Sequence, residues 1–206
     1  MTTRRPSVGV LALQGAFARH VEALSQLGFD GFEVRTGEQL ERCDALILPG
    51  GESTTMSKLL DGLELADRLE KRLADGLPVF GTCAGMILLA SAISDGRPDQ
   101  HRFGAIDIAV RRNGYGRQID SFETDLAVPE IAASGLDGQP FTAVFIRAPV
   151  VESWTESVTV LATVDGDPVL CRQGPILVSS FHPELTDDLR LHRYFLEAVA
   201  GFAVDC

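Results

Sequence analysis

Short, continuous apolar runs alternate with helical patterns along the first half of the chain, and this alternation constrains the fold most strongly. Strands are predicted over residues 7–13, 32–34, 45–48 and 79–80, and helices over 17–27, 53–73 and 84–93. Such alternation is typical of a parallel sheet with helices on both faces. Because active sites of these sheets lie beyond the carboxyl ends of the strands, we expect functional residues in the turns near Gln14, Gly50-Gly51 and Cys83.

The second half of the chain has a different character. Strands are predicted over residues 106–110, 141–146, 158–164, 169–171 and 176–181, and a closing helix over 189–202. Turn signals at 165–168 and 173–175 separate the last three strands, which predicts an antiparallel meander. The chain shows no linker-like segment and no internal repeat, so we expect residues 1–206 to form a single domain.

Charge and cysteine usage exclude several classes of protein. The chain has 18 Lys and Arg against 29 Asp and Glu, a net charge of −11, which disfavours binding to nucleic acid or to a membrane surface. No apolar segment approaches the roughly 20 residues that span a bilayer, and no secretory signal opens the chain. The four cysteines form no CxxC pair and no metal-ligand spacing with histidine. We expect a reduced, cytoplasmic protein without a metal or cofactor.

The segment Gly81-Thr82-Cys83-Ala84-Gly85 is the most informative for chemistry. It follows a predicted strand and opens a predicted helix, the context of a nucleophile elbow. Small residues on both sides let the chain turn sharply, and the helix N-terminus favours a thiolate. The alternative is a buried structural cysteine, the usual fate of an intracellular thiol.

A thiolate nucleophile needs a base, and the base needs a group that orients it. His20 and His192 lie within helical patterns, where a surface or satisfied histidine is the ordinary explanation, and His101 lies in the polar stretch 97–102. His182 instead ends an apolar strand and is followed by Pro183 and Glu184. Because proline keeps the preceding residue out of the helical region, an extended His-Pro-Glu would turn His182 and Glu184 to the same side.

The turn Pro49-Gly50-Gly51-Glu52-Ser53 is the third element, and Ser53 is the predicted N-cap of the following helix. Two glycines let backbone N–H groups approach a ligand closely, which suits an oxyanion hole beside a nucleophile. A plain strand-to-helix turn is the alternative. A phosphate cradle is a further alternative, but the lysine of the Walker pattern is missing.

Together these residues resemble the class I (triad) glutamine amidotransferases, and within them the branch that serves pyridoxal 5′-phosphate synthases. The motifs that carry the resemblance are VGVLALQGAFARH, ALILPGGESTTM, GTCAGMILLA, DSFETDL, FTAVFIRAP and SFHPELTDD, and they cover nearly the whole chain. The resemblance implies an α/β, three-layer, flavodoxin-like fold. Its mostly parallel sheet would have helices on both faces and a C-terminal antiparallel meander.

The resemblance also implies roles for individual residues. It assigns Cys83 as the nucleophile, His182 as the base and Glu184 as the residue that orients it. Backbone N–H groups at Gly51 and Ala84 would form the oxyanion hole. The implied glutamine contacts are Gly51, Glu52, Ser53, Arg112, Ile146 and Arg147.

Two points concern residues outside the triad. Without the resemblance, Arg112 and Arg147 would be assigned to surface or structural ion pairs. The chain also departs from the family at 113–117, where it reads NGYGR and relatives often read NSFGR.

The implied reaction is hydrolysis of L-glutamine to L-glutamate and ammonia through a cysteine thioester. The implied partner is a separate barrel-type, (β/α)₈ synthase subunit that uses the ammonia to build pyridoxal 5′-phosphate, vitamin B6, within a hetero-oligomeric complex. One alternative is a glutaminase subunit of another synthase, such as imidazole glycerol phosphate synthase. The other is a non-catalytic binding module on the same fold, for which the nucleophile or base would be missing. A cysteine peptidase or chaperone of related fold is a weaker alternative.

Overall fold

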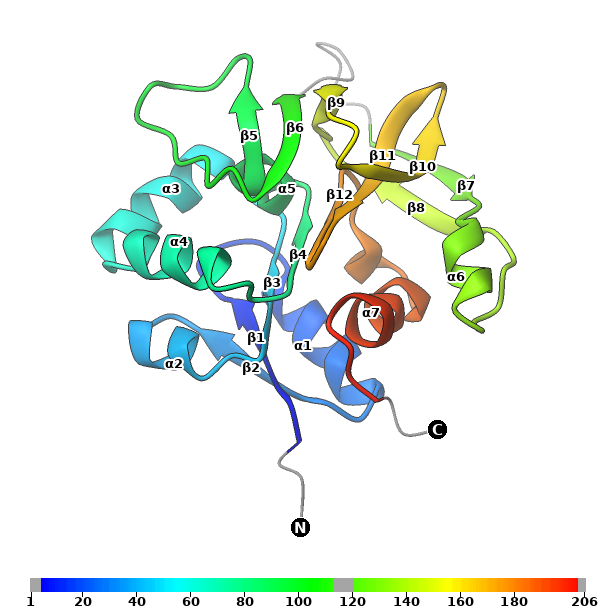
Figure 1. Cartoon of the computed structure of the whole chain (residues 1–206), viewed down its shortest axis with the longest axis horizontal. Coiled ribbons are helices and arrows are strands. Elements are labelled where there is room, and N and C mark those ends of the chain that lie inside the picture. The colour runs from blue at the N-terminus through cyan, green and yellow to red at the C-terminus, as the bar shows by residue number, and fades with distance from the viewer. Residues whose placement is uncertain (1–4, 113–120, 204–206) are drawn as a thin grey trace.

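A seven-stranded sheet crosses the centre of the computed structural model, which describes residues 5–112 and 121–203. Its strand order is β10–β11–β12–β4–β3–β1–β2 (Figure 1). The strands are β1 (Ser7–Leu11), β2 (Asp30–Val34), β3 (Ala45–Leu48), β4 (Val79–Thr82), β10 (Thr159–Val164), β11 (Asp167–Gln173) and β12 (Ile176–Ser179). From β12 to β2 neighbouring strands are parallel, whereas β10, β11 and β12 pair antiparallel. The mostly parallel sheet and the C-terminal meander are as predicted.

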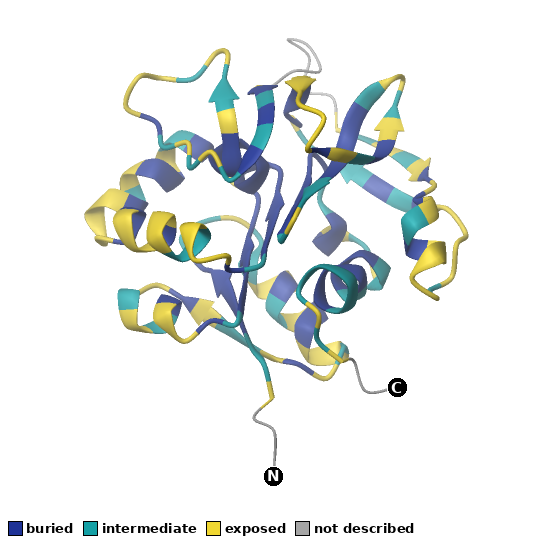
Figure 2. Ribbon diagram, in the orientation of Figure 1, coloured by how far each residue is buried: buried dark blue, intermediate teal, exposed yellow. Residues whose placement is uncertain are grey.

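Helices cover both faces of this sheet, and the strand residues divide between two cores. In β3, Leu46 and Leu48 belong to one core, whereas Ala45 and Ile47 belong to the other. This division follows from the period of two in a strand, so a strand buried on both faces must be continuously apolar. The central strands β3, β4 and β12 are buried throughout, and the outer helix faces are exposed (Figure 2).

Each core has its own set of helices. The first contains buried residues of α2 (Gly37–Glu41), α3 (Ser53–Gly62), α4 (Ala66–Ala74) and α5 (Ala84–Leu89). The second contains residues of α1 (Phe17–Gln26) and α7 (Arg190–Tyr194), and also of α6 (Pro129–Ala133). These two layers and the sheet between them make the three-layer α/β arrangement.

Two smaller sheets flank the large one. One contains β5 (Ala90–Ile93), β6 (Ile106–Arg111) and β9 (Val150–Trp154), and the other contains β7 (Phe122–Leu126) and β8 (Phe141–Phe145). No helix in the described ranges is both long enough and apolar enough to cross a membrane.

Three helix predictions are wrong in extent. The helix predicted over 53–73 is interrupted between α3 and α4, where Glu64 has φ 54°. The helix predicted over 84–93 ends at Leu89, and the chain continues as β5 because its backbone pairs with β6. The closing helix is α7 followed by a π-helical turn, η2 (Phe195–Val199).

Candidate active site

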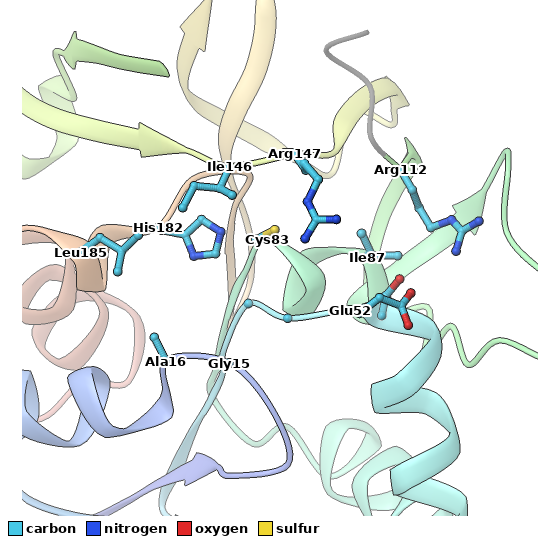
Figure 3. A pocket seen from close by; sticks show the side chains of 13 residues that line it. Gly15, Ala16, Glu52, Cys83, Ile87, Arg112, Ile146, Arg147, His182 and Leu185 are labelled. Atoms are coloured by element: carbon cyan, nitrogen blue, oxygen red, sulfur yellow. The ribbon is translucent and has the colours of Figure 1, made fainter. Parts of the chain in front are cut away.

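Loops at the carboxyl ends of β1, β3, β4 and β12 meet at one pocket of about 360 Å³ (Figure 3). These four strands are neighbours in the sheet, so turns far apart in the sequence lie together, as predicted for Gly50-Gly51 and Cys83. The lining residues are Gly15, Ala16, Gly50, Gly51, Glu52, Ser53, Cys83, Ile87, Arg112, Ile146, Arg147, His182 and Leu185. Such a volume is in the usual range for small-molecule sites.

Cys83 occupies a sharp turn between β4 and α5. Its backbone has φ 48° and ψ −103°, a conformation that side-chain-bearing residues rarely adopt, and its N–H donates to the Ser179 carbonyl at 2.8 Å. The two flanking positions leave no room for a Cβ atom, so both must be glycine. A Cβ on Gly85 would lie 2.1 Å from the Leu48 carbonyl oxygen, and one on Gly81 would lie 2.6 Å from Leu89 Cδ1. The predicted strand–turn–helix geometry is confirmed.

His182 follows β12, and its N–H donates to the Val144 carbonyl of β8 at 2.8 Å. Its backbone (φ −110°, ψ 87°) is non-helical, as the following proline requires. The expectation of an extended His-Pro-Glu is wrong beyond that point, because residues Pro183–Leu185 form a 3₁₀ turn, η1. The turn brings Glu184 Oε1 to 2.8 Å from His182 Nδ1.

The electrostatics of this group favour a charged imidazole. Burial opposes protonation of His182, but hydrogen bonds to the Cys83 and Glu184 side chains outweigh it and raise the pKa of His182 to about 10. Burial likewise opposes ionisation of Glu184. The hydrogen bond from His182 nevertheless holds the pKa of Glu184 below its usual value. The arrangement is therefore suited to a thiolate–imidazolium pair supported by a carboxylate.

The glycine-rich turn lies directly against this pair. A Cβ on Gly50 would lie 2.4 Å from His182 Cε1 and 3.4 Å from Cys83 Cβ, so only glycine leaves room for the ring. Neither the Gly51 N–H nor the Ala84 N–H donates to another residue within the described ranges. Both N–H groups therefore remain without a protein acceptor in these ranges.

Glu52, rather than Ser53, is the N-cap of α3. Its carboxylate accepts from the Thr54 N–H at 3.0 Å and from the Thr55 N–H at 2.8 Å. Although burial works the other way, hydrogen bonds from Thr55 and Thr54 lower the pKa of Glu52 to about 2. The backbone N–H of Glu52 donates to Gln14 Oε1 at 2.9 Å.

The two arginines at the pocket differ in how they are held. The Arg112 guanidinium donates to Thr54 Oγ1 at 3.0 Å and to the Asp95 carbonyl at 2.8 Å, and its Nε lies 3.5 Å from the Asp95 carboxylate. The Arg147 guanidinium points into the pocket toward Cys83 (Figure 3) and has no ion pair within the described part of the chain. Arg147 also has a positive φ, 45°, which strains its backbone at this position.

All the predicted site residues come together. All line the pocket except Glu184, which lies behind His182, and Ala84, which follows Cys83. Sequence reasoning missed Gln100, whose side chain donates to Ser53 Oγ at 2.9 Å and accepts from Arg112 at 3.2 Å. It also missed the lining residues Ile87 and Leu185. The departure at 113–117 lies outside the described residues, and so does Cys206.

Comparison with known proteins decides the family. The sequence matches the SNO glutamine amidotransferase family over residues 10–201. The chain belongs to the SNO glutamine amidotransferase family. It is 55% identical to "Pyridoxal 5′-phosphate synthase subunit PdxT" of Parafrankia sp. (strain EAN1pec), over 94% of this chain and 93% of that protein. It is 53% identical to the protein of the same name from Carboxydothermus hydrogenoformans, over 93% and 97%.

A solved structure supports the same conclusion. The "Crystal structure of glutamine amidotransferase" is 53% identical, covers 95% of this chain and 99% of its own, and superposes with a TM-score of 0.86. As a glutamine amidotransferase the chain is an amide hydrolase, a glutaminase with a class I α/β fold. In residues 5–112 and 121–203, no group of three or more His, Cys, Asp or Glu side chains is arranged to hold a metal ion.

Proposed function

We propose that residues 1–206 act as one domain that hydrolyses L-glutamine with Cys83 as nucleophile, His182 as acid and base, and Glu184 as the residue that orients it. The observation that carries this proposal is the connected series Cys83–His182–Glu184. Cys83 and His182 line the pocket, and His182 Nδ1 lies 2.8 Å from Glu184 Oε1 behind it. This series combines a nucleophile, a base and an orienting carboxylate, the requirements of covalent acyl transfer.

The geometry gives each proton a place to go. The Cys83 thiolate attacks the side-chain amide carbon of glutamine, and the Gly51 and Ala84 N–H groups stabilise the oxyanion. The His182 imidazolium gives its proton to the departing nitrogen, so that ammonia leaves and a thioester remains. Neutral His182 then takes a proton from water, and the hydroxide attacks the thioester carbon. Release of glutamate restores the thiolate and the imidazolium.

Charged groups that line the pocket would hold the rest of glutamine. Arg147 is the better candidate for the substrate α-carboxylate, because its guanidinium points into the pocket whereas that of Arg112 is engaged by Thr54, Gln100 and Asp95. A planar guanidinium can bind a carboxylate through two parallel hydrogen bonds. The Glu52 carboxylate, kept ionised by the helix N-terminus, suits the α-ammonium group.

We further propose that the ammonia passes to a barrel-type pyridoxal 5′-phosphate synthase subunit in a hetero-oligomeric complex. The support is that relatives 55% and 53% identical over more than nine-tenths of both chains are pyridoxal 5′-phosphate synthase subunits. We assign the complex to the cytoplasm, where the free thiols of Cys43, Cys83 and Cys171 would stay reduced.

The test is release of glutamate from L-glutamine by the wild-type chain and Cys83→Ala, each with and without the barrel subunit. We expect activity that rises sharply with the partner and is lost in Cys83→Ala, while circular dichroism and Tm show a folded variant. Turnover retained in Cys83→Ala would remove Cys83 from its role. Activity indifferent to this partner would assign the chain to another synthase, and inactivity of the wild type in both conditions would favour a binding module.

A further inference from the structure

Two histidines outside the pocket form a buried pair in the second core. His20 of α1 is fully buried and His192 of α7 is 1% exposed. His20 Nδ1 lies 2.9 Å from His192 Nε2, and the Phe80 and His192 rings form a T-shaped pair. Burying polar side chains this deeply costs free energy unless they are hydrogen-bonded. Apolar packing alone therefore does not explain why two histidines lie here.

The pair extends to the carboxylate behind His182. His20 Nε2 lies 3.4 Å from Glu184 Oε2, and both side chains are fully buried. Within the described residues neither atom makes a hydrogen bond, and the short distance between them makes each the nearest available partner of the other. Because His182 already occupies Oε1 at 2.8 Å, both oxygens of Glu184 face a histidine.

The protonation of the pair follows from its surroundings. Burial lowers the pKa of His20 despite the nearby Glu184, and burial together with His20 lowers the pKa of His192 to about 3. Both rings are therefore neutral near pH 7, and a neutral imidazole has one donor and one acceptor nitrogen. Only a proton on Nε2 of each ring gives both contacts a donor and an acceptor. His192 Nε2–H would then donate to His20 Nδ1, and His20 Nε2–H would face Glu184 Oε2.

We propose that His20, held by His192, is a positioning residue for glutamine hydrolysis that fixes the second oxygen of Glu184 and so keeps the first aimed at His182. This inference rests on the proposed role of Cys83, His182 and Glu184. A carboxylate held at both oxygens cannot rotate away from the imidazole ring as the proton moves. The neutral pair also stabilises the ionised form of Glu184 without adding a charge to the core.

Other charged groups lie near this pair. A cavity of about 30 Å³ borders Glu184 and His192. The charged residues that line it besides Glu184 are Arg19, Glu22 and Asp187. Asp188 favours the charged form of His192, against the effect of burial. A substitution at His20 leaves all of these unchanged, so its effect on pH dependence reports on Glu184 and its two partners.

The test compares His20→Leu, which removes the donor, with His20→Gln, whose amide keeps an N–H at the corresponding position. Leu24→Ala is the matched control, because Leu24 is buried one turn further along the same helix. Glutaminase activity is measured against pH with the synthase partner present. For His20→Leu we expect kcat to fall about tenfold at unchanged KM and the acid limb of the pH profile to move up by about one unit, because Glu184 loses a donor to its charged form. His20→Gln should restore most of both.

The outcomes separate the two proposals. If Cys83→Ala retains activity, the proposed function fails. If Cys83→Ala is inactive but the acid limb of His20→Leu is unmoved, or moves equally in Leu24→Ala, the role of His20 is overturned while the proposed function stands. Nitrogen-15 NMR of histidine-labelled wild-type protein gives a test independent of folding in the variants. We expect neutral His20 with its proton on Nε2, and a proton on Nδ1 or a doubly protonated ring at pH 7 would overturn the proposal.

Discussion

At Gly50 the space that a missing side chain leaves is filled by the ring of His182. A Cβ built on Gly50 meets His182 Cε1 at 2.4 Å and Cys83 Cβ at 3.4 Å. We therefore expect Gly50→Ala to push the imidazole away from its position between Cys83 and Glu184. A displacement of about 1 Å in a catalytic group can cost about 100-fold in rate, and we expect kcat/KM for glutamine to fall by about that factor.

The matched control for this prediction is Gly62→Ala. Gly62 is the last residue of α3, and a Cβ there meets nothing within 4 Å. We expect Gly62→Ala to keep wild-type kcat/KM and to gain a few tenths of a kcal/mol in stability, since alanine favours helix over glycine. Steady-state glutaminase assays of both variants decide the matter, and equal activities would contradict the steric role of Gly50.

Residue types at a turn could be predicted from the sequence, but their long-range partners could not. Cys83 and His182 stand out because strand ends and neighbouring glycine or proline mark them. His20 carries a weaker signal, since it is spaced three and four residues from Phe17 and Leu24 and so shares their apolar face. No local pattern predicts that His20 pairs with His192. The two residues are 172 positions apart in the sequence, yet His20 Nδ1 lies 2.9 Å from His192 Nε2.

At the scale of elements, one residue at the beginning of α3 contributes both to the stability of the helix and to the substrate pocket. Glu52 accepts hydrogen bonds from the Thr54 and Thr55 N–H groups and also lines the pocket. We expect Glu52→Ala to destabilise the fold by about 1 kcal/mol through loss of the cap and to raise KM for glutamine. Glu52→Asp should keep most of the stability because aspartate caps well. Urea unfolding and steady-state kinetics check both effects, and a Glu52→Ala variant of unchanged stability would contradict the capping role.

Element boundaries were predictable where periodicity and turn residues agree. The strand at residues 45–48 is observed with the predicted bounds because the Pro49-Gly50-Gly51 turn ends it. The run over 84–93 is apolar except for Ser91, so neither a period of 3.6 nor one of 2 distinguishes helix from strand. Its end at Leu89 is decided by backbone pairing of β5 with β6, a tertiary contact absent from the local sequence.

For the whole molecule, the parallel sheet both assembles the site and buries the histidine pair that supports it. The rule that sites lie at the carboxyl ends of parallel strands predicts which turns meet, but the strand order that makes β12 a neighbour of β4 needs the structure. Because α1 and α7 cover the same face, His20 and His192 meet beneath that site. The same burial gives the folding equilibrium a pH dependence.

We expect the fold to lose stability as the pH falls below about 6.5. His192, with a folded-state pKa of about 3, and His20, also lowered, stay neutral in the fold but take up protons on unfolding below 6.5. For each such proton, the free energy of unfolding falls by about 1.4 kcal/mol for every unit by which the pH is lowered. His182 adds no slope in this range, because its raised pKa keeps it protonated in the fold as in the unfolded chain.

A comparison of wild type with a His192 variant between pH 6 and pH 4.5 isolates this histidine. Glu184 and Glu52, whose lowered pKa values add slope as the pH approaches their unfolded value of 4.5, are present in both chains. Urea unfolding of wild type and His192→Gln at several pH values in this range gives the two slopes. The slope of unfolding free energy against pH should be smaller in the variant by about 1.4 kcal/mol per pH unit, the contribution of one proton, because glutamine does not titrate. His20 still contributes its own proton. Equal slopes would mean that His192 already binds a proton in the folded protein, and the neutral pair beneath Glu184 would then be wrong.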